Sequence, residues 1–307
     1  MTQRPELWSL DDVRALDPET TRIWASRSVE SRVRSELPFD RWQPDAPLPS
    51  MIKHLVAVGG GTLLDEAKRF VHDEAPDVAL VAIPSVWGSG AEASPVVVLN
   101  RDGKQIRTGD EYLPAARAVW PELAESLSER RAIDACGDAW AHAMEGFLSP
   151  LATNELRREL AEVIRTMIDL PLTNDPRWFE PSARAAALQA RSSVGLVHGI
   201  AHTIELPLAR ALGDDWGHAR LCALYLAPVL RLDRAVGTKL HALFLEFDLD
   251  ESKIKSAALR LFDDRLYQAT LPVLEAEWRN VLRDRCTRTN SVLVRADHLA
   301  HFLTFLP

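Results

Sequence analysis

A change in the hydrophobic pattern near residue 121 constrains the fold of this 307-residue sequence more than any other feature. Up to that point, short apolar runs alternate with loops that contain glycine and proline, and afterwards the pattern is that of long amphipathic helices. Strand, glycine loop, helix and strand in succession are typical of a parallel α/β sheet. The sequence therefore predicts an α/β domain over residues 1–122 and an all-helical domain over residues 123–307.

Individual elements can be placed within this outline. We expect strands at 54–58, 78–83, 95–99 and 115–120, with a helix at 63–72, and later helices at 129–148, 152–169, 182–212 (broken) and 218–233. Residues 1–50 are mixed, and their tryptophans (Trp8, Trp24 and Trp42) indicate packed structure without a readable strand pattern. An α/β half followed by a helical half predicts a ligand site in a cleft between them.

Charge and cysteine content exclude several classes of partner. The net charge of −8 argues against nucleic acid or an anionic membrane surface, and no apolar run approaches the ~20 residues of a membrane span. The three cysteines (Cys136, Cys222 and Cys286) are an odd, widely spaced set, which predicts reduced thiols. Because the first residues also lack the apolar core of a signal peptide, we expect a cytoplasmic protein.

The segment from Val56 to Lys68 predicts a strand that enters a triple-glycine turn and then a helix. Gly59, Gly60 and Gly61 would let the backbone approach a phosphate at the positive end of the helix dipole. Thr62 can cap the helix or donate to that phosphate. A branched side chain at Gly60 is expected to block this approach and to strain a positive φ. The alternative is a tight βα turn that binds nothing.

A second polar loop follows the strand expected at 78–83. It runs from Ser85 to Ser94 and includes Gly88, Ser89 and Gly90. Its hydroxyls and backbone N–H groups suit a pyrophosphate or the amide of a nicotinamide. Taken by itself, the pattern also fits a plain connecting loop.

Three segments of the helical half place an aspartate and histidines where one divalent metal can collect them. Asp138 and His142 are spaced i, i+4, and so are His198 and His202, which puts each pair on one helix face. His218 follows a glycine after a further apolar run. Three imidazoles and one carboxylate suit Fe(II) or Zn(II), which can polarise an alcohol or carbonyl oxygen. His202 by itself also fits a core histidine.

With these motifs the chain resembles the iron-dependent (group III) alcohol dehydrogenases, relatives of glycerol dehydrogenase and dehydroquinate synthase. The triple glycine with Thr62, Asp65 and Lys68 is similar to the diphosphate loop of that family, and Ser85 to Glu92 to its nicotinamide loop. The resemblance implies a dehydroquinate synthase-like fold, with NAD or NADP as cofactor. The cofactor-binding residues implied are Gly59, Gly60, Gly61, Thr62, Asp65, Ser85 and Ser89.

The metal segments carry the most specific part of this resemblance. It implies that the metal ligands are Asp138, His142, His198 and His218. It also implies that His202 is a non-ligand histidine beside the substrate, so that the catalytic residues are His202 and the ligand Asp138.

The sequence departs from the family pattern in three places. The glycine loop begins earlier, at residue 59, so the Rossmann-like sheet is expected to be truncated, with nothing before residue 50 replacing its first strand and turn. Trp87 is bulky where the family has a small residue, and Gly217 stands where proline often precedes the last ligand. We therefore expect weak nucleotide binding, or binding that needs a partner to complete the site.

Three functions remain open from the sequence. The first is a metal- and NAD(P)-dependent oxidoreductase that oxidises an alcohol or reduces a carbonyl in a specialised biosynthetic pathway, with one version acting on a peptide's C-terminal Thr presented by an accessory protein. The second is a metal lyase or cyclase of the dehydroquinate synthase type, which would need a basic cluster for a phosphate substrate. The third is a non-catalytic descendant that acts as a binding subunit. The resemblance implies a homodimer.

Overall fold

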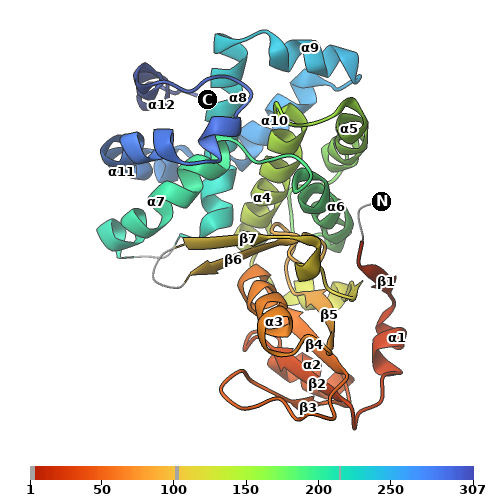
Figure 1. The fold of residues 1–307 in the computed structure, drawn as a ribbon. Coiled ribbons are helices and arrows are strands. Elements are labelled where there is room, and N and C mark those ends of the chain that lie inside the picture. The colour runs from red at the N-terminus through yellow and green to blue at the C-terminus, as the bar shows by residue number, and fades with distance from the viewer. Residues whose placement is uncertain (1–3, 101–103, 214–215) are drawn as a thin grey trace. The chain divides into compact units, whose positions relative to one another are not determined.

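The computed structural model describes residues 4–100, 104–213 and 216–307, and the chain divides into two compact units at residue 127 (Figure 1). The N-terminal unit is α/β and the C-terminal unit is helical. The predicted boundary at residue 122 falls inside the short 3-10 helix η2 (Pro121–Ser126). Within the described ranges, no helix combines the length and the apolarity needed to cross a membrane.

The N-terminal unit is built on a six-stranded sheet in the order β1-β8-β5-β4-β2-β3, in which every pairing is parallel. The predicted strands at 54–58, 78–83 and 115–120 are present. The strands of this sheet are β1 (Glu6–Trp8), β2 (Thr21–Ala25), β3 (Asp40–Arg41), β4 (His54–Gly59), β5 (Ala79–Pro84) and β8 (Ala116–Ala118). Parallel strands with helical connections give the predicted α/β architecture.

Residues before 50 contribute more than expected, since β1, β2 and β3 all join this sheet. Val56 and Val58 of β4 face a core that includes the helices α1 (Leu10–Arg14) and α2 (Glu30–Glu36). Leu55 and Ala57 face the opposite core, which is covered by α3 (Gly61–Glu74). The segment without a readable strand pattern therefore supplies half of the strands and one helical layer.

The predicted strand at 95–99 exists, but it does not belong to the parallel sheet. It is β6 (Val96–Asn100), which pairs antiparallel with β7 (Lys104–Thr108) in a separate two-stranded sheet. The short helix η1 (Asp110–Tyr112) follows this hairpin.

The helical unit surrounds one nearly buried helix, α4 (Glu129–Leu148), which packs most extensively against α8 (His218–Val236). A Cβ added at Gly137 of α4 would lie 2.3 Å from the Cβ of Ala223 in α8, so only glycine permits this close approach. The remaining helices are α5 (Asn154–Ile168), η3 (Pro176–Trp178), α6 (Phe179–Gln189), α7 (Leu196–Leu212), α9 (Lys239–Glu246), α10 (Glu251–Leu261), α11 (Asp264–Arg283), η4 (Thr287–Thr289), η5 (Ala296–His298) and α12 (Leu299–Leu303).

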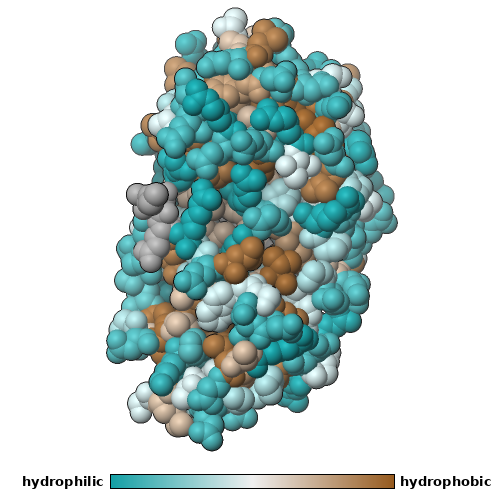
Figure 2. Space-filling view, turned by 90° about the vertical axis from the view of Figure 1, so that its right-hand side faces the viewer, coloured by the Kyte–Doolittle hydropathy of each residue, from teal (hydrophilic) through white to brown (hydrophobic). Residues whose placement is uncertain are grey.

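These helices match the predicted ranges, including the break within 182–212 that separates α6 from α7. The exposed large hydrophobic side chains lie on separate segments of the chain, among them Leu151, Leu245 and Leu293. Figure 2 agrees with this distribution, since on the face it shows the hydrophobic residues form small patches among hydrophilic ones. All three cysteines are buried thiols outside any disulfide, as predicted.

Candidate metal centre

Helix α4 presents three polar side chains toward one place in the core of the helical unit. Asp138, His142 and Glu145 follow one another at i, i+4 and i+7, so they share one face of the helix. The side chains of Asp138 and Glu145 are only 6% and 5% exposed, and that of His142 is 13% exposed. Buried carboxylates need charged or hydrogen-bonding partners, and the neighbouring helices supply them.

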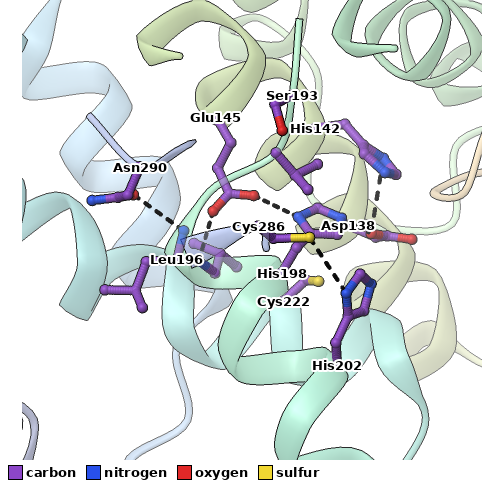
Figure 3. A network of polar contacts seen from close by, with 12 residues as sticks. Asp138, His142, Glu145, Ser193, Leu196, His198, His202, Cys222, Cys286 and Asn290 are labelled. Atoms are coloured by element: carbon purple, nitrogen blue, oxygen red, sulfur yellow. Dashed lines mark hydrogen bonds and ion pairs between the residues drawn. The ribbon is translucent and has the colours of Figure 1, made fainter. Parts of the chain in front are cut away.

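Helices α7 and α8 bring the other histidines to this carboxylate, and Figure 3 shows His198 of α7 beside Asp138. His198 Nε2 lies 3.6 Å from Asp138 Oδ1, and His142 Nδ1 lies 3.8 Å from the same oxygen. The ring centroids of His198 and His218 are 5.3 Å apart, and those of His142 and His198 are 4.6 Å apart. The structure thus brings together all four residues that the sequence predicted as ligands.

The tightest group of ligand atoms differs from the predicted set by one member. Asp138, His198, His218 and Cys222 each offer one ligand atom, and these atoms all lie within 4.8 Å of one another. Cys222 was not predicted from the sequence, although it follows His218 at the same i, i+4 spacing that identified the other pairs. His142 lies beside this group through its contact with Asp138.

The residues fit a divalent cation. The buried atoms Asp138 Oδ1 and His198 Nε2 have no hydrogen-bond partner among the described residues, and they point toward each other across 3.6 Å. A buried carboxylate oxygen left in this way is costly, and a cation between the two atoms would satisfy both. Carboxylate, imidazole and thiol groups are ligands of Fe(II) and Zn(II), so the donor chemistry agrees with the predicted metal.

Glu145 holds His198 and the start of α7 at the same time. One of its oxygens lies 2.5 Å from His198 Nδ1, and the other accepts a hydrogen bond from the backbone N–H of Val197 at 2.6 Å. Asn290 Oδ1 accepts from the preceding N–H, that of Leu196, at 3.1 Å. Side chains therefore satisfy the first N–H groups of α7, where the N-cap residue is Gly195. These contacts fix the orientation of the His198 ring, which faces Asp138.

The charges of these groups are coupled. Burial acts to raise the pKa of Asp138, but the neighbouring His142, His198 and His218 outweigh burial and hold that pKa well below its usual range. Burial acts to lower the pKa of His198, but Glu145 and Asp138 outweigh it and raise the pKa to about 9. Both shifts reflect the gathering of opposite charges in a place with little solvent.

A second layer supports Asn290. Asp233 of α8 accepts a hydrogen bond from Asn290 Nδ2 at 2.8 Å and another from the hydroxyl of Ser291. Burial raises the pKa of Asp233 to about 6, in spite of these two hydrogen bonds. Glu145, Asp233 and Asn290 are the supporting residues that sequence reasoning missed. Only Glu145 gives a local signal, because it lies two turns after Asp138.

His202 lies next to the candidate metal centre and outside its tightest group of ligand atoms. Its ring stacks on that of His218, with centroids 5.0 Å apart and an angle of 25° between the planes. Its Nδ1 is 3.7 Å from the thiol of Cys286, which follows helix α11. This placement agrees with a non-ligand histidine beside the site.

Gly217 precedes His218 with a φ of 75°. Proline is locked near −65°, so the chain cannot enter α8 here in the way that a proline would direct it. The departure from the family pattern at this position is therefore a change of backbone conformation as well as of residue type.

In the N-terminal unit, the glycine turn joins β4 to α3 with a geometry that corrects two expectations. The N-cap of α3 is Gly60, with no side-chain cap, so Thr62 does not cap the helix and lies exposed in its first turn. Gly60 has a φ of −77°, and a Cβ there would meet nothing closer than 3.7 Å. The expectation that a side chain at Gly60 would strain a positive φ is therefore wrong.

The constrained glycine of this turn is Gly61. A Cβ at Gly61 would lie 2.6 Å from the hydroxyl oxygen of Ser89 and 2.9 Å from its Cβ. The two predicted cofactor loops are thus in contact, and Ser85 also joins them because its N–H donates to Gly59 O at 2.9 Å. Within the second loop, Gly88 and Gly90 have φ values of 106° and 56°, which favour glycine.

Asp65 has a structural role that was not predicted from the sequence. Its buried carboxylate lies 3.0 Å from Lys68 Nζ and accepts a hydrogen bond from the N–H of Val98 at 3.0 Å. Lys68 in turn donates to the carbonyl oxygens of Ala91 and Ser94. Both oxygens of Asp65 are therefore engaged within the protein, and the pair anchors the second loop and β6 to α3.

Comparisons with known proteins identify the fold. No family model matches the chain. Among curated proteins, it is 30% identical over 213 residues to a phosphonoacetaldehyde reductase from Streptomyces viridochromogenes, which covers 59% of this chain and 53% of that protein. It is 24% identical over 200 residues to the 1-propanol dehydrogenase PduQ from Salmonella typhimurium, covering 59% of this chain and 52% of that protein. The chain spans about half the length of these curated relatives.

Solved structures match nearly the whole chain. The iron-containing alcohol dehydrogenase from Thermococcus thioreducens has a TM-score of 0.74 at 17% identity, covering 99% of this chain and 98% of that one. The maleylacetate reductase from Agrobacterium tumefaciens has a TM-score of 0.76 at 17% identity, covering 99% and 96%. The sulfoacetaldehyde reductase from Bifidobacterium kashiwanohense, in complex with NAD+, has a TM-score of 0.67 at 15% identity, covering 96% and 95%. The chain therefore has the fold of the iron-containing alcohol dehydrogenases, which confirms the predicted resemblance and fold class.

Proposed function

We propose that this chain is a metal- and nicotinamide-dependent oxidoreductase that interconverts an alcohol and the corresponding aldehyde or ketone. The observation that carries the proposal is the cluster of buried Asp138 and His198 with partly buried His218, and His142 beside it, at the meeting of α4, α7 and α8. Two of the curated relatives are named as a phosphonoacetaldehyde reductase and a 1-propanol dehydrogenase.

Each side chain has a role in this proposal. When bound, a divalent cation would polarise the substrate oxygen, and a nicotinamide would donate or accept the hydride. Asp138, His198 and His218 would hold the cation, and Glu145 would keep the His198 ring turned so that Nε2 faces the site. His202, stacked on His218, would pass a proton between the substrate oxygen and solvent.

The N-terminal unit supplies the groups for a dinucleotide. Helix α3 begins at the glycine turn with no side-chain cap, so its first N–H groups would be able to donate to a diphosphate. Gly61 and Ser89 pack against each other there, so the two loops would present one surface to the cofactor. Either NAD or NADP is compatible with these groups.

The finer functional assignments remain part of the proposal. We place the enzyme in a specialised biosynthetic pathway, acting on a small alcohol or carbonyl compound or on the hydroxyl of a peptide's C-terminal Thr. An accessory protein would present such a peptide, and the chain would act as a homodimer in the cytoplasm. The metal would be Fe(II) or Zn(II).

A combined binding and turnover experiment tests the proposal. The purified chain should hold about one Fe or Zn per molecule and bind NAD(H) in calorimetry, and it should oxidise NADH or NADPH when small aldehydes are added. Metal and nucleotide binding without any turnover on aldehydes, alcohols or Thr-terminated peptides would contradict the oxidoreductase. A chain that binds neither metal nor nucleotide would instead be a binding subunit.

A further inference from the structure

Cys222 lies inside the candidate metal centre, and none of the assignments above gives it a role. It follows His218 by one turn of α8, it is fully buried, and its Sγ is 3.5 Å from His218 Nε2. Figure 3 shows it in the same group of side chains as Asp138 and His198. The ligand atoms of these four residues lie within 4.8 Å of one another, so the thiol belongs to the tightest donor set of the site.

The separations agree with those of a tetrahedral zinc site. With Zn–N and Zn–O distances of about 2.1 Å and Zn–S of about 2.3 Å, tetrahedral corners lie about 3.4 Å apart for nitrogen and oxygen and about 3.6 Å apart for nitrogen and sulfur. The observed values are 3.6 Å between His198 Nε2 and Asp138 Oδ1 and 3.5 Å between His218 Nε2 and Cys222 Sγ. Two edges of the donor set therefore have the length that a shared cation requires.

We propose that Cys222 is a metal ligand of this chain, and that the site thereby favours Zn(II) over Fe(II). This inference rests on the proposed function, which requires a metal site, and it adds a thiolate ligand to that site. On binding, the thiol loses its proton to solvent and the sulfur lone pair forms the bond to the metal, with no change of oxidation state. A soft thiolate shifts the preference of a nitrogen and oxygen site toward zinc.

This donor set also changes the role of His142. Asp138, His198, His218 and Cys222 already supply four donors, so His142 is not needed as a fourth ligand, and a substrate oxygen would bind as a fifth. His142 Nδ1 lies 3.8 Å from Asp138 Oδ1, so His142 would form an ion pair with the ligand Asp138 without binding the metal itself. Loss of the His142 ring should therefore cost less metal than loss of the Cys222 thiol.

Cobalt substitution tests the proposal directly. The metal-free full chain is loaded with Co(II), and its absorption spectrum is recorded together with the cobalt content of the desalted protein. A thiolate ligand gives a sulfur-to-cobalt charge-transfer band in the near ultraviolet. We expect this band in the wild-type protein, and its loss in Cys222→Ser with cobalt still bound. Cys286→Ser, which alters the other thiol close to a histidine of this region, should keep the band.

Each outcome separates this proposal from the function on which it rests. Stoichiometric cobalt without the band, or a band lost in Cys286→Ser and kept in Cys222→Ser, overturns the role of Cys222 and leaves the metal enzyme standing. Wild-type protein that binds no cobalt overturns the metal site and the proposed function together. Thermal unfolding of both serine variants establishes that they are folded when the spectra are taken.

Metal content provides a second and independent readout. Protein produced with equal supplies of iron and zinc should carry mainly zinc, and Cys222→Ala should lower the ratio of zinc to iron at least several-fold. His142→Ala should retain more metal than Cys222→Ala. An unchanged ratio in Cys222→Ala, or greater loss of metal in His142→Ala, would contradict a thiolate ligand.

Discussion

Glu145 and His198 form the closest contact of the candidate metal centre, with a carboxylate oxygen 2.5 Å from the imidazole Nδ1. The second oxygen of Glu145 caps α7 through the N–H of Val197 at 2.6 Å. One buried side chain on α4 therefore sets both the position of α7 and the orientation of the ring that it carries. A carboxylate behind a metal-binding histidine also makes that histidine a stronger ligand.

Replacing Glu145 with Gln should weaken metal binding by about 10- to 100-fold, as is typical when the partner of a metal-binding histidine is altered. Gln keeps the size and can still accept from Val197, but it has no charge to support His198. Competition with a chromogenic chelator measures the affinity. Metal affinity equal to that of the wild type would show that the Glu145–His198 pair is only structural.

His198→Ala and His218→Ala should each lose most of the bound metal, because removal of a direct ligand leaves too few donors. Elemental analysis of the purified variants measures the loss. His241→Ala is a suitable control, since His241 is bound to Glu251 on the surface of the same unit. If both variants kept a full complement of metal, the site would have to be elsewhere.

His202→Ala should keep its metal and lose turnover, since His202 stacks on His218 but lies outside the tightest group of ligand atoms. A general acid or base typically contributes 10²- to 10⁴-fold, so we expect kcat to fall by about that factor. Loss of metal in this variant would instead make His202 a ligand.

Gly60→Ala and Gly61→Ala form a matched pair in the glycine turn. A Cβ at Gly60 has room, whereas a Cβ at Gly61 would meet Ser89 at 2.6 Å. Gly61→Ala should therefore lower the affinity for NAD(H) and destabilise the fold by about 1–3 kcal/mol, and Gly60→Ala should be near neutral in stability. Calorimetry and chemical unfolding measure both. The double variant Gly61→Ala with Ser89→Gly should recover stability, and failure to recover would place the strain elsewhere.

Asp233 should make the stability depend on pH. Burial raises its pKa to about 6, from 3.8 when it is exposed, so its protonated form is favoured in the folded chain. This contribution to stability is complete below pH 3.8 and is lost as the pH rises through 6. Asn does not ionise, so Asp233→Asn should not lose stability in this way. The free energy of unfolding of the variant, relative to that of the wild type, should therefore rise by about 1–3 kcal/mol between pH 4 and pH 7. Unfolding curves that keep the same separation at every pH would contradict this.

The sequence by itself determined the division into two units, the helices of the second unit and the four residues, Asp138, His142, His198 and His218, that gather at the candidate metal centre. These features depend on local periodicity, because i, i+4 spacing fixes which side chains share a helix face whatever surrounds it. The pairs Asp138–His142 and His198–His202 could therefore be read directly. Gly59 to Gly61 likewise identified the strand-to-helix turn.

Only the tertiary structure decided features that depend on contacts between distant segments. Strands β1 and β3 span three and two residues, too short for a pattern, and they exist because neighbouring strands pair with them. The constraint on Gly61 comes from Ser89, and the anchoring role of Asp65 involves Val98. Cys222 joins the candidate metal centre because Gly137 lets α4 and α8 approach, which places groups far apart in sequence close enough to share one ion.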